Sequence, residues 1–190
     1  MSRKERTLKR AVHLEGVSLH SGARVEVRVE PAPAGTGIVF QRADLLDSPD
    51  IPALAGNLSM SQRRTVLREG AADVGMVEHL LSACHGLQVD NLIVRVSGSE
   101  LPGTDGSAAP YVELLRSGGI MEQKRGRKVL RVFNPHVLRD GEAELVVLPP
   151  SGDGLRVRYL PEYPDGVDAK PVVFDTSLDD YAKDIAVART

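Results

Sequence analysis

A glutamate and a histidine stand side by side in the segment from Gly75 to Gly86 of this 190-residue chain. Apolar residues recur around them at helical spacing, which predicts a short amphipathic helix that ends at Gly86. Neighbouring helix residues differ in direction by about 100°, so Glu78 and His79 can border one cleft. A zinc ion is one candidate partner, with His79 as ligand and Glu78 as the base for a water molecule. An ordinary exposed glutamate and histidine explain the same spacing.

The other histidines do not complete a metal site in the sequence. His85 points about 120° away from His79 on the same helix. His13, His20 and His136 each stand alone in a strand or turn context, so none is expected to be a ligand. Because there is no H-x-x-x-H or C-x-x-C spacing, further ligands must come from elsewhere.

A second candidate lies in the loop from Leu101 to Pro110. Asp105 is followed by small residues at the start of an expected helix, where backbone N–H groups can collect an anion. A tight capped turn explains the same residues. The glycines match neither a Walker loop nor a dinucleotide fingerprint, so nucleotide hydrolysis and NAD binding have no support.

The elements around these residues are strands and short helices. Alternating residues predict strands over 7–30, around a turn between Gly16 and Gly22. Residues 30–37 hold proline and glycine, and we expect 38–41 to return as the second strand of a hairpin. The run 92–96 is rich in β-branched residues and predicts a buried strand, and a helix should follow from Ser107 to Gly118.

The later part of the chain repeats some of this order. Residues 144–148 and 155–160 alternate around a turn rich in proline and glycine, which predicts another hairpin, and the echo suggests two domains on related plans. The polar, basic stretch 123–128 is taken as the linker between domains 1–122 and 129–190. A last helix, capped by Ser177, runs to Thr190 without a stop signal, so we expect a continuation.

The composition excludes several classes of protein. Hydrophobic residues make up 42% and charged residues 26%, with a formal net charge of −2, as in a folded globular protein without general affinity for nucleic acid. Basic residues near both ends of the first domain are best explained as a solvated surface, because only 4% of residues are aromatic. The single cysteine, Cys84, favours a reducing, cytoplasmic setting, and no apolar run reaches the roughly 20 residues of a membrane span.

Several motifs together resemble the UDP-3-O-acyl-N-acetylglucosamine deacetylase family. The likeness is strong from Thr7 to Ile120, thins after Lys128 and returns at the end of the chain. In order, the motifs are Thr7-Leu-Lys-Arg10, Gly16-Val-Ser-Leu-His-Ser-Gly22, Pro31-Ala-Pro-Ala-Gly-Thr-Gly-Ile-Val39, Val77-Glu-His-Leu80, Asp90-Asn-Leu-Ile93, Asp105-Gly-Ser-Ala-Ala-Pro110 and Ala188-Arg-Thr190.

The resemblance implies an α+β fold of two related two-layer domains, each a sheet backed by helices, with the second one incomplete here. It implies zinc-dependent deacetylation of UDP-3-O-acyl-N-acetylglucosamine, the committed step of lipid A synthesis. His79 would be a zinc ligand and Glu78 the general base. Thr190, which closes the Ala-Arg-Thr motif, would steady the oxyanion.

The family carries its other zinc ligands and a further histidine after the Ala-Arg-Thr motif. Because catalytic zinc sites use three protein ligands, we expect this chain to be inactive alone. It would be a fragment of the enzyme, or a second polypeptide would supply the missing C-terminal part. A catalytically dead module that binds a nucleotide sugar or a protein is the main alternative, and an RNA-binding domain is a third.

Overall fold

The computed structural model describes residues 3–152, 154–161, 170–177 and 179–189. Its internal contacts divide the chain into a first unit, residues 1–127 with 181–190, and a second unit, residues 128–180. Strands greatly outnumber helices, and almost all of the strand pairs are antiparallel. This mixture fits the α+β class that the sequence predicts.

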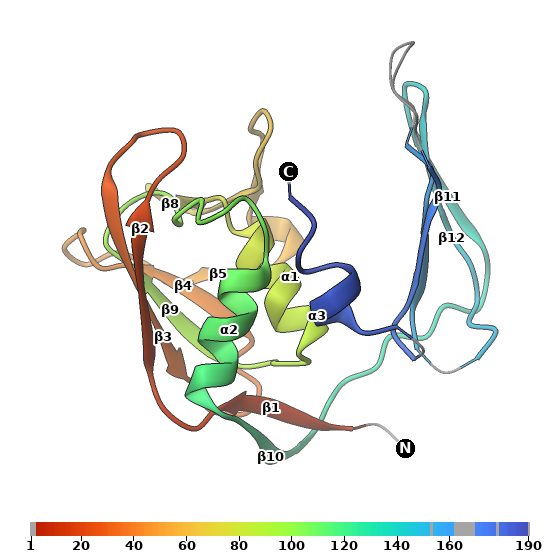
Figure 1. Cartoon of the computed structure of the whole chain (residues 1–190), viewed down its shortest axis with the longest axis horizontal. Coiled ribbons are helices and arrows are strands. Elements are labelled where there is room, and N and C mark those ends of the chain that lie inside the picture. Colours follow the sequence, from red (N-terminus) through yellow and green to blue (C-terminus); the bar gives the residue numbers. More distant parts are fainter. Residues whose placement is uncertain (1–2, 153, 162–169, 178, 190) are drawn as a thin grey trace. The chain divides into compact units, whose positions relative to one another are not determined.

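A five-stranded sheet is the centre of the first unit (Figure 1). In spatial order its strands are β2 (Val12–Val17), β3 (Arg24–Pro31), β9 (Leu92–Val96), β4 (Ile38–Arg42) and β5 (Ile51–Pro52). Only β4 and β9 run parallel. The predicted turn between β2 and β3 and the predicted strand 92–96 are confirmed.

The hairpin predicted over residues 30–41 is wrong. Strand β9 lies between β3 and β4 and pairs with both, so that Leu92 stands opposite Pro31 on one side and Ile38 on the other. The proline- and glycine-rich residues 32–37 therefore cross over the end of β9 instead of forming a tight turn. Sequence periodicity identifies the two strands but not the third strand that separates them.

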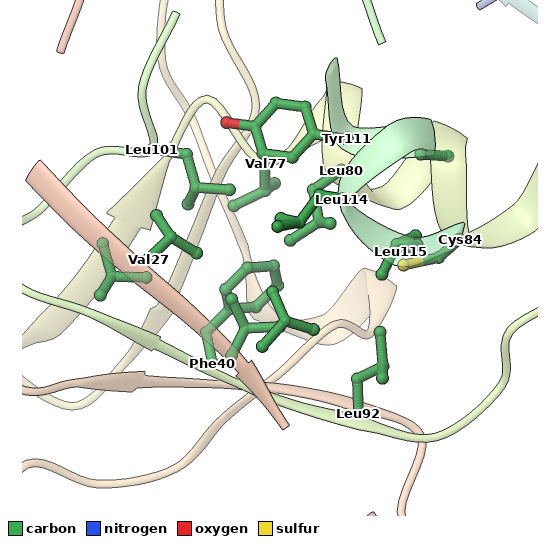
Figure 2. Packing of buried hydrophobic residues seen from close by; sticks show 14 of the residues in the cluster. Val27, Phe40, Val77, Leu80, Cys84, Leu92, Leu101, Tyr111, Leu114 and Leu115 are labelled. Carbon is green, nitrogen blue, oxygen red and sulfur yellow. The ribbon is translucent and has the colours of Figure 1, made fainter. Parts of the chain in front are cut away.

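Helices α1 (Glu78–Gly86) and α2 (Ala109–Gly118) pack side by side over one face of this sheet (Figure 1). Figure 2 shows Leu80 and Leu115 of the helices facing Phe40 and Leu92 of the strands, and all four are fully buried. Along β9, inward residues alternate with the exposed Arg95, as the pleat of a strand requires. Both predicted helices are confirmed, although α1 begins at Glu78. No helix in the described part of the chain is long and apolar enough to cross a membrane.

A short helix, α3 (Tyr181–Asp184), belongs to the first unit and is much shorter than the terminal helix that the sequence predicts. The hydroxyl groups of Tyr181 and Ser82 lie 2.7 Å apart. A Cβ added at Gly86 would lie 2.1 Å from Cδ1 of Tyr181. Gly86 is thus required by the close approach of the tyrosine ring, and the residue after it, Leu87, has an ordinary right-handed conformation.

Two smaller sheets complete the first unit. The first has the order β6 (Leu58–Ser59), β7 (Val66–Glu69), β8 (Ala72–Gly75), and a short 3₁₀ helix, Ala55–Asn57, precedes it. The second is the antiparallel pair β1 (Lys4–Leu8) and β10 (Ile120–Gly126). The stretch 123–128, expected as a linker, therefore begins within a paired strand.

The second unit contains two antiparallel pairs, β11 (His136–Asp140) with β12 (Ala143–Val147) and β13 (Arg156–Tyr159) with β14 (Val172–Asp175). The hairpin predicted from 144–148 and 155–160 is therefore wrong, because each of its strands has another partner. Most residues of these four strands are exposed. The described residues of this unit contain no helix that could cover them.

The side chain of Asn91 connects four parts of the first unit. Its Oδ1 accepts hydrogen bonds from the backbone N–H groups of Gly35 and Gly37, at 3.1 and 2.8 Å. Its Nδ2 donates to Glu5 and Gln123, at 3.0 and 2.8 Å. Asn91 is 1% exposed, so all four hydrogen-bonding positions of its amide are used inside the protein.

We predict that Asn91→Ala lowers the free energy of unfolding by roughly 3 kcal/mol, because it leaves several buried polar groups without partners. Urea denaturation followed by circular dichroism measures the change. The matched control is Asn134→Ala, at an exposed position of the second unit, which should change stability by less than about 0.5 kcal/mol. Equal effects of the two substitutions would contradict this role of Asn91.

Candidate functional site

Glu78 and His79 are the first two residues of α1, directly after the residues that leave β8. His79 is 8% exposed, and no hydrogen bond to its ring is found among the described residues. Glu78 is half-buried, and its Oε2 accepts a hydrogen bond from the backbone N–H of Thr65 at 3.2 Å. A histidine that is largely buried and yet lines a cavity is unlike an ordinary surface histidine.

His79 lines a cavity of about 410 Å³. Three segments form the walls: the turn between β2 and β3, the junction of β8 and α1, and the loop before α2. Among the residues that line it, only His79 has an ionisable side chain. The lining residues are Val17, Ser18, Leu19, Gly22, Met76, His79, Gly103, Thr104 and Gly106.

Backbone conformation is unusual at two points of this wall. Met76 and Thr104 have φ values of 57° and 50°, in the left-handed region that residues with a Cβ rarely adopt. Both residues line the cavity, and Met76 lies two residues before Glu78. Strain of this kind costs about 1–3 kcal/mol per residue and concentrates at functional sites.

The loop before α2 is fastened to the turn between β2 and β3. Gly103 donates its backbone N–H to the carbonyl of Val17 at 3.1 Å, and the buried hydroxyl of Tyr111 donates to the carbonyl of Pro102 at 2.7 Å. A Cβ at Gly16 would lie 2.6 Å from Cβ of Pro102, so only glycine allows this approach. Burial raises the pKa of Tyr111, so the hydroxyl stays protonated as a donor.

Asp105 closes the turn at the start of α2. Its Oδ1 accepts hydrogen bonds from the hydroxyl and the backbone N–H of Ser107, at 2.7 and 3.0 Å, and these bonds hold the pKa of Asp105 below its usual range. The carboxylate thus occupies donors that an anion would need, which favours the capped-turn interpretation. A guanidinium nitrogen of Arg189, from the Ala-Arg-Thr motif, lies 3.6 Å from Oδ2 of Asp105. Thr190 lies outside the described residues.

The remaining histidines do not join His79 in a metal site. His13 lies 3.6 Å from Glu26 on the sheet surface, and His136 is exposed in the second unit. His85 is at the far end of α1, where burial, followed by nearby arginines, lowers its pKa. Among the described residues, no group of three or more histidine, cysteine, aspartate or glutamate side chains could hold a metal ion.

Several of the basic residues near both ends of the first domain pair with carboxylates. Arg3 forms a two-pronged contact with Asp90, at 2.6 and 2.9 Å, and Arg127 lies 3.2 Å from the same side chain. Arg125 lies 3.5 Å from Glu5. These contacts fasten β1 and β10, and they favour a structural explanation of this basic surface over a nucleic-acid site.

Sequence reasoning missed Glu100, which lies in the loop after β9. It is 3% exposed, and it accepts hydrogen bonds from Ser18 and from both the backbone N–H and Nδ1 of His20. Burial acts to raise its pKa, but the bonds from Ser18 and His20 outweigh burial and lower it. In the sequence, Glu100 stands in a polar, glycine-containing loop, where nothing marks it as buried.

The geometry describes an α+β protein with a buried histidine at the wall of one cavity and a glutamate directly before it in the chain. A family model described as UDP-3-O-acyl N-acetylglycosamine deacetylase matches residues 5–190. The chain belongs to this family.

Two bacterial relatives are similar over nearly the whole chain. The UDP-3-O-acyl-N-acetylglucosamine deacetylase of Pseudomonas entomophila is 40% identical over 190 residues, and that of Teredinibacter turnerae is 41% identical over 196 residues. Each alignment covers 98% of this chain and 62% of the relative. The chain therefore spans less than two thirds of the length of these relatives.

We predict that Glu100→Gln destabilises the protein by roughly 1–3 kcal/mol at pH 7, because the ionised carboxylate is the better acceptor. A lowered folded-state pKa stabilises the fold above the unfolded-state pKa, near 4.5, and this contribution disappears as the pH falls through the folded-state pKa. Urea denaturation of both proteins should therefore show a difference in the free energy of unfolding at pH 7 that disappears at acidic pH. The control is Glu26→Gln, whose side chain is 59% exposed. A difference in the free energy of unfolding that is the same at both pH values would refute the prediction.

Proposed function

We propose that this chain supplies the Glu-His part of an active site that deacetylates UDP-3-O-acyl-N-acetylglucosamine in lipid A synthesis. Family membership and the names of the relatives support the reaction. The observation that carries the proposal is that His79 is largely buried and lines a cavity, directly after Glu78 in the chain. Glu78 precedes it on the same turn of α1.

His79 fits the role of a zinc ligand. A neutral imidazole nitrogen is a good donor to zinc, and His79 brings an imidazole to the cavity wall from a largely buried position. It is one donor of the three that a catalytic zinc site uses, and the described residues contain no further cluster. The other ligands would come from the additional length that the relatives have. Zinc, when bound, acts as a Lewis acid toward the acetamide carbonyl.

Glu78 fits the role of general base. Its Oε2 is held by the Thr65 N–H, which fixes the carboxylate and leaves Oε1 for a water molecule. Glu78 takes one proton from this water as the water oxygen attacks the carbonyl carbon. The carbon–nitrogen bond then breaks, acetate leaves, and the amine nitrogen takes up a proton. We propose that Thr190 stabilises the negative charge on the carbonyl oxygen, as the family resemblance implies.

The greater length of the relatives also bears on the second unit. Its four strands are mostly exposed, with Leu138, Leu145 and Val157 among the exposed apolar residues, and its described residues include no helix. We propose that it is the beginning of a second two-layer domain on the plan of the first. Further chain, in the same polypeptide or in a second one, would cover these strands, and the 190-residue chain would be inactive alone.

The state of Cys84 agrees with a cytoplasmic setting, which we propose for this chain. Cys84 is a free, fully buried thiol, and burial raises its pKa to about 12. It therefore stays a protonated, unreactive thiol that packs as a small apolar residue. A reducing compartment keeps it in that form.

We predict that a version of the protein with the full length of its relatives releases acetate from UDP-3-O-acyl-N-acetylglucosamine, and that the 190-residue chain does not. Glu78→Ala should lower kcat at least about 100-fold, because general-base catalysis is lost. Glu113→Ala, at an exposed position of α2, is the matched control and should leave kcat unchanged. If the longer protein releases no acetate under any condition, the deacetylase proposal fails and a binding module takes its place.

A further inference from the structure

Glu100 is a buried carboxylate that the proposed reaction does not use. Its side chain is 4% exposed, and it contacts two elements of the cavity wall. Through its side chain it accepts hydrogen bonds from Ser18 and His20 of the turn between β2 and β3. Its backbone bridges to Gly75, the last residue of β8, and the neighbouring residues bond to Gly75 on both sides. Glu100 thus fastens the turn and the strand end that lead into the cavity.

The contact with His20 defines the orientation of an imidazole. Nδ1 of His20 lies 2.7 Å from Oε1 of Glu100, and the backbone N–H of His20 donates to the same oxygen at 3.2 Å. Because a carboxylate only accepts hydrogen bonds, Nδ1 must carry the proton. The other ring nitrogen, Nε2, then has no role in this contact. The His20 side chain is 39% exposed, unlike the carboxylate that holds it.

His20 is next in the chain to residues of the cavity wall. It lies in the chain between Leu19 and Gly22, and both of these residues line the cavity, as does Ser18. Ser18 donates its hydroxyl to Oε2 of Glu100, and its oxygen also lies 2.7 Å from the hydroxyl of Ser21. Arg64 is 4.0 Å from Oε2 and balances the charge of the carboxylate. Ser18 and His20 of this turn therefore supply the hydrogen bonds to Glu100.

We propose that Glu100 is a positioning residue that fixes His20 with Nδ1 protonated, so that Nε2 is left for the polar part of a substrate in the neighbouring cavity. The identity of that substrate rests on the proposed function, but the geometry of the pair does not. A carboxylate that only filled space would leave the ring of His20 free to turn. The lowered pKa of Glu100 agrees with this role, because the ionised form is the one that accepts all these bonds.

The first test measures the tautomer of His20 by ¹⁵N-resolved NMR of the histidine-labelled 190-residue chain, at the alkaline end of the ring's titration. We expect the Nδ1–H form to be the major one, although free imidazole side chains prefer Nε2–H. In Glu100→Ala the major form should change to Nε2–H. In Glu100→Gln, whose amide oxygen still accepts a hydrogen bond, Nδ1–H should persist.

The control is His13, which lies near the exposed Glu26 on the same strand pair. Glu26→Ala should leave the tautomer of His20 unchanged. If His20 is mainly Nε2–H in the unmodified chain, the proposal is wrong, whether or not Glu100→Ala folds. An unchanged tautomer in a folded Glu100→Ala variant, as judged from its amide spectrum, overturns it as well.

The second test separates this inference from the proposed function. In the full-length protein, His20→Ala and Glu100→Ala should each lower kcat/KM by the same factor, roughly tenfold, and the double variant should lower it no further. Additive losses would show that Glu100 does not act through His20. A full-length protein without deacetylase activity overturns the proposed function alone, because the tautomer measurement needs no turnover.

Discussion

The first unit depends on the placement of β9 between β3 and β4, and Asn91 is the residue that makes this placement possible. A strand inserted between two others needs a connection that crosses its end, and the backbone N–H groups of that connection need acceptors. Asn91 supplies both acceptor positions to Gly35 and Gly37 from the residue before β9 begins. Its amide nitrogen ties β1 and β10 to the same point. A single buried side chain therefore links the sheet to the strand pair beside it.

The cavity follows from this arrangement. The chain leaves β9 into the loop that contains Glu100 and Asp105, and this loop is fastened to the turn between β2 and β3. Helix α1 begins shortly after β8 ends, and His79 lines the same cavity as this loop and the turn between β2 and β3. Met76 and Thr104, in the left-handed region, are backbone costs that packing alone does not require, and the largely buried His79 lines the same wall.

Much of this could be predicted from the sequence, and the failures have physical causes. Periodicity identified β2, β3, α1 and α2, because each of these elements buries one face, and the run of β-branched residues identified β9. Periodicity failed for strand partners in both units, since a strand's pattern gives the buried face but not the neighbour. The Glu78-His79 pair was noticed because it borders the apolar stripe of an amphipathic helix, and the family resemblance gave the pair its expected zinc role. Glu100 was missed, because burial of a loop carboxylate depends on Ser18 and His20, which are about 80 residues away.

The central claim is that His79 is one ligand of a metal site whose other ligands lie outside the described chain. Titration calorimetry with zinc, on the metal-free full-length protein and on its His79→Ala variant, tests this most directly. The account predicts one tight site per chain, and a loss of at least about 100-fold in affinity when His79 is replaced. Equal affinity in the two proteins would contradict the account, as would the absence of any zinc site in the full-length protein.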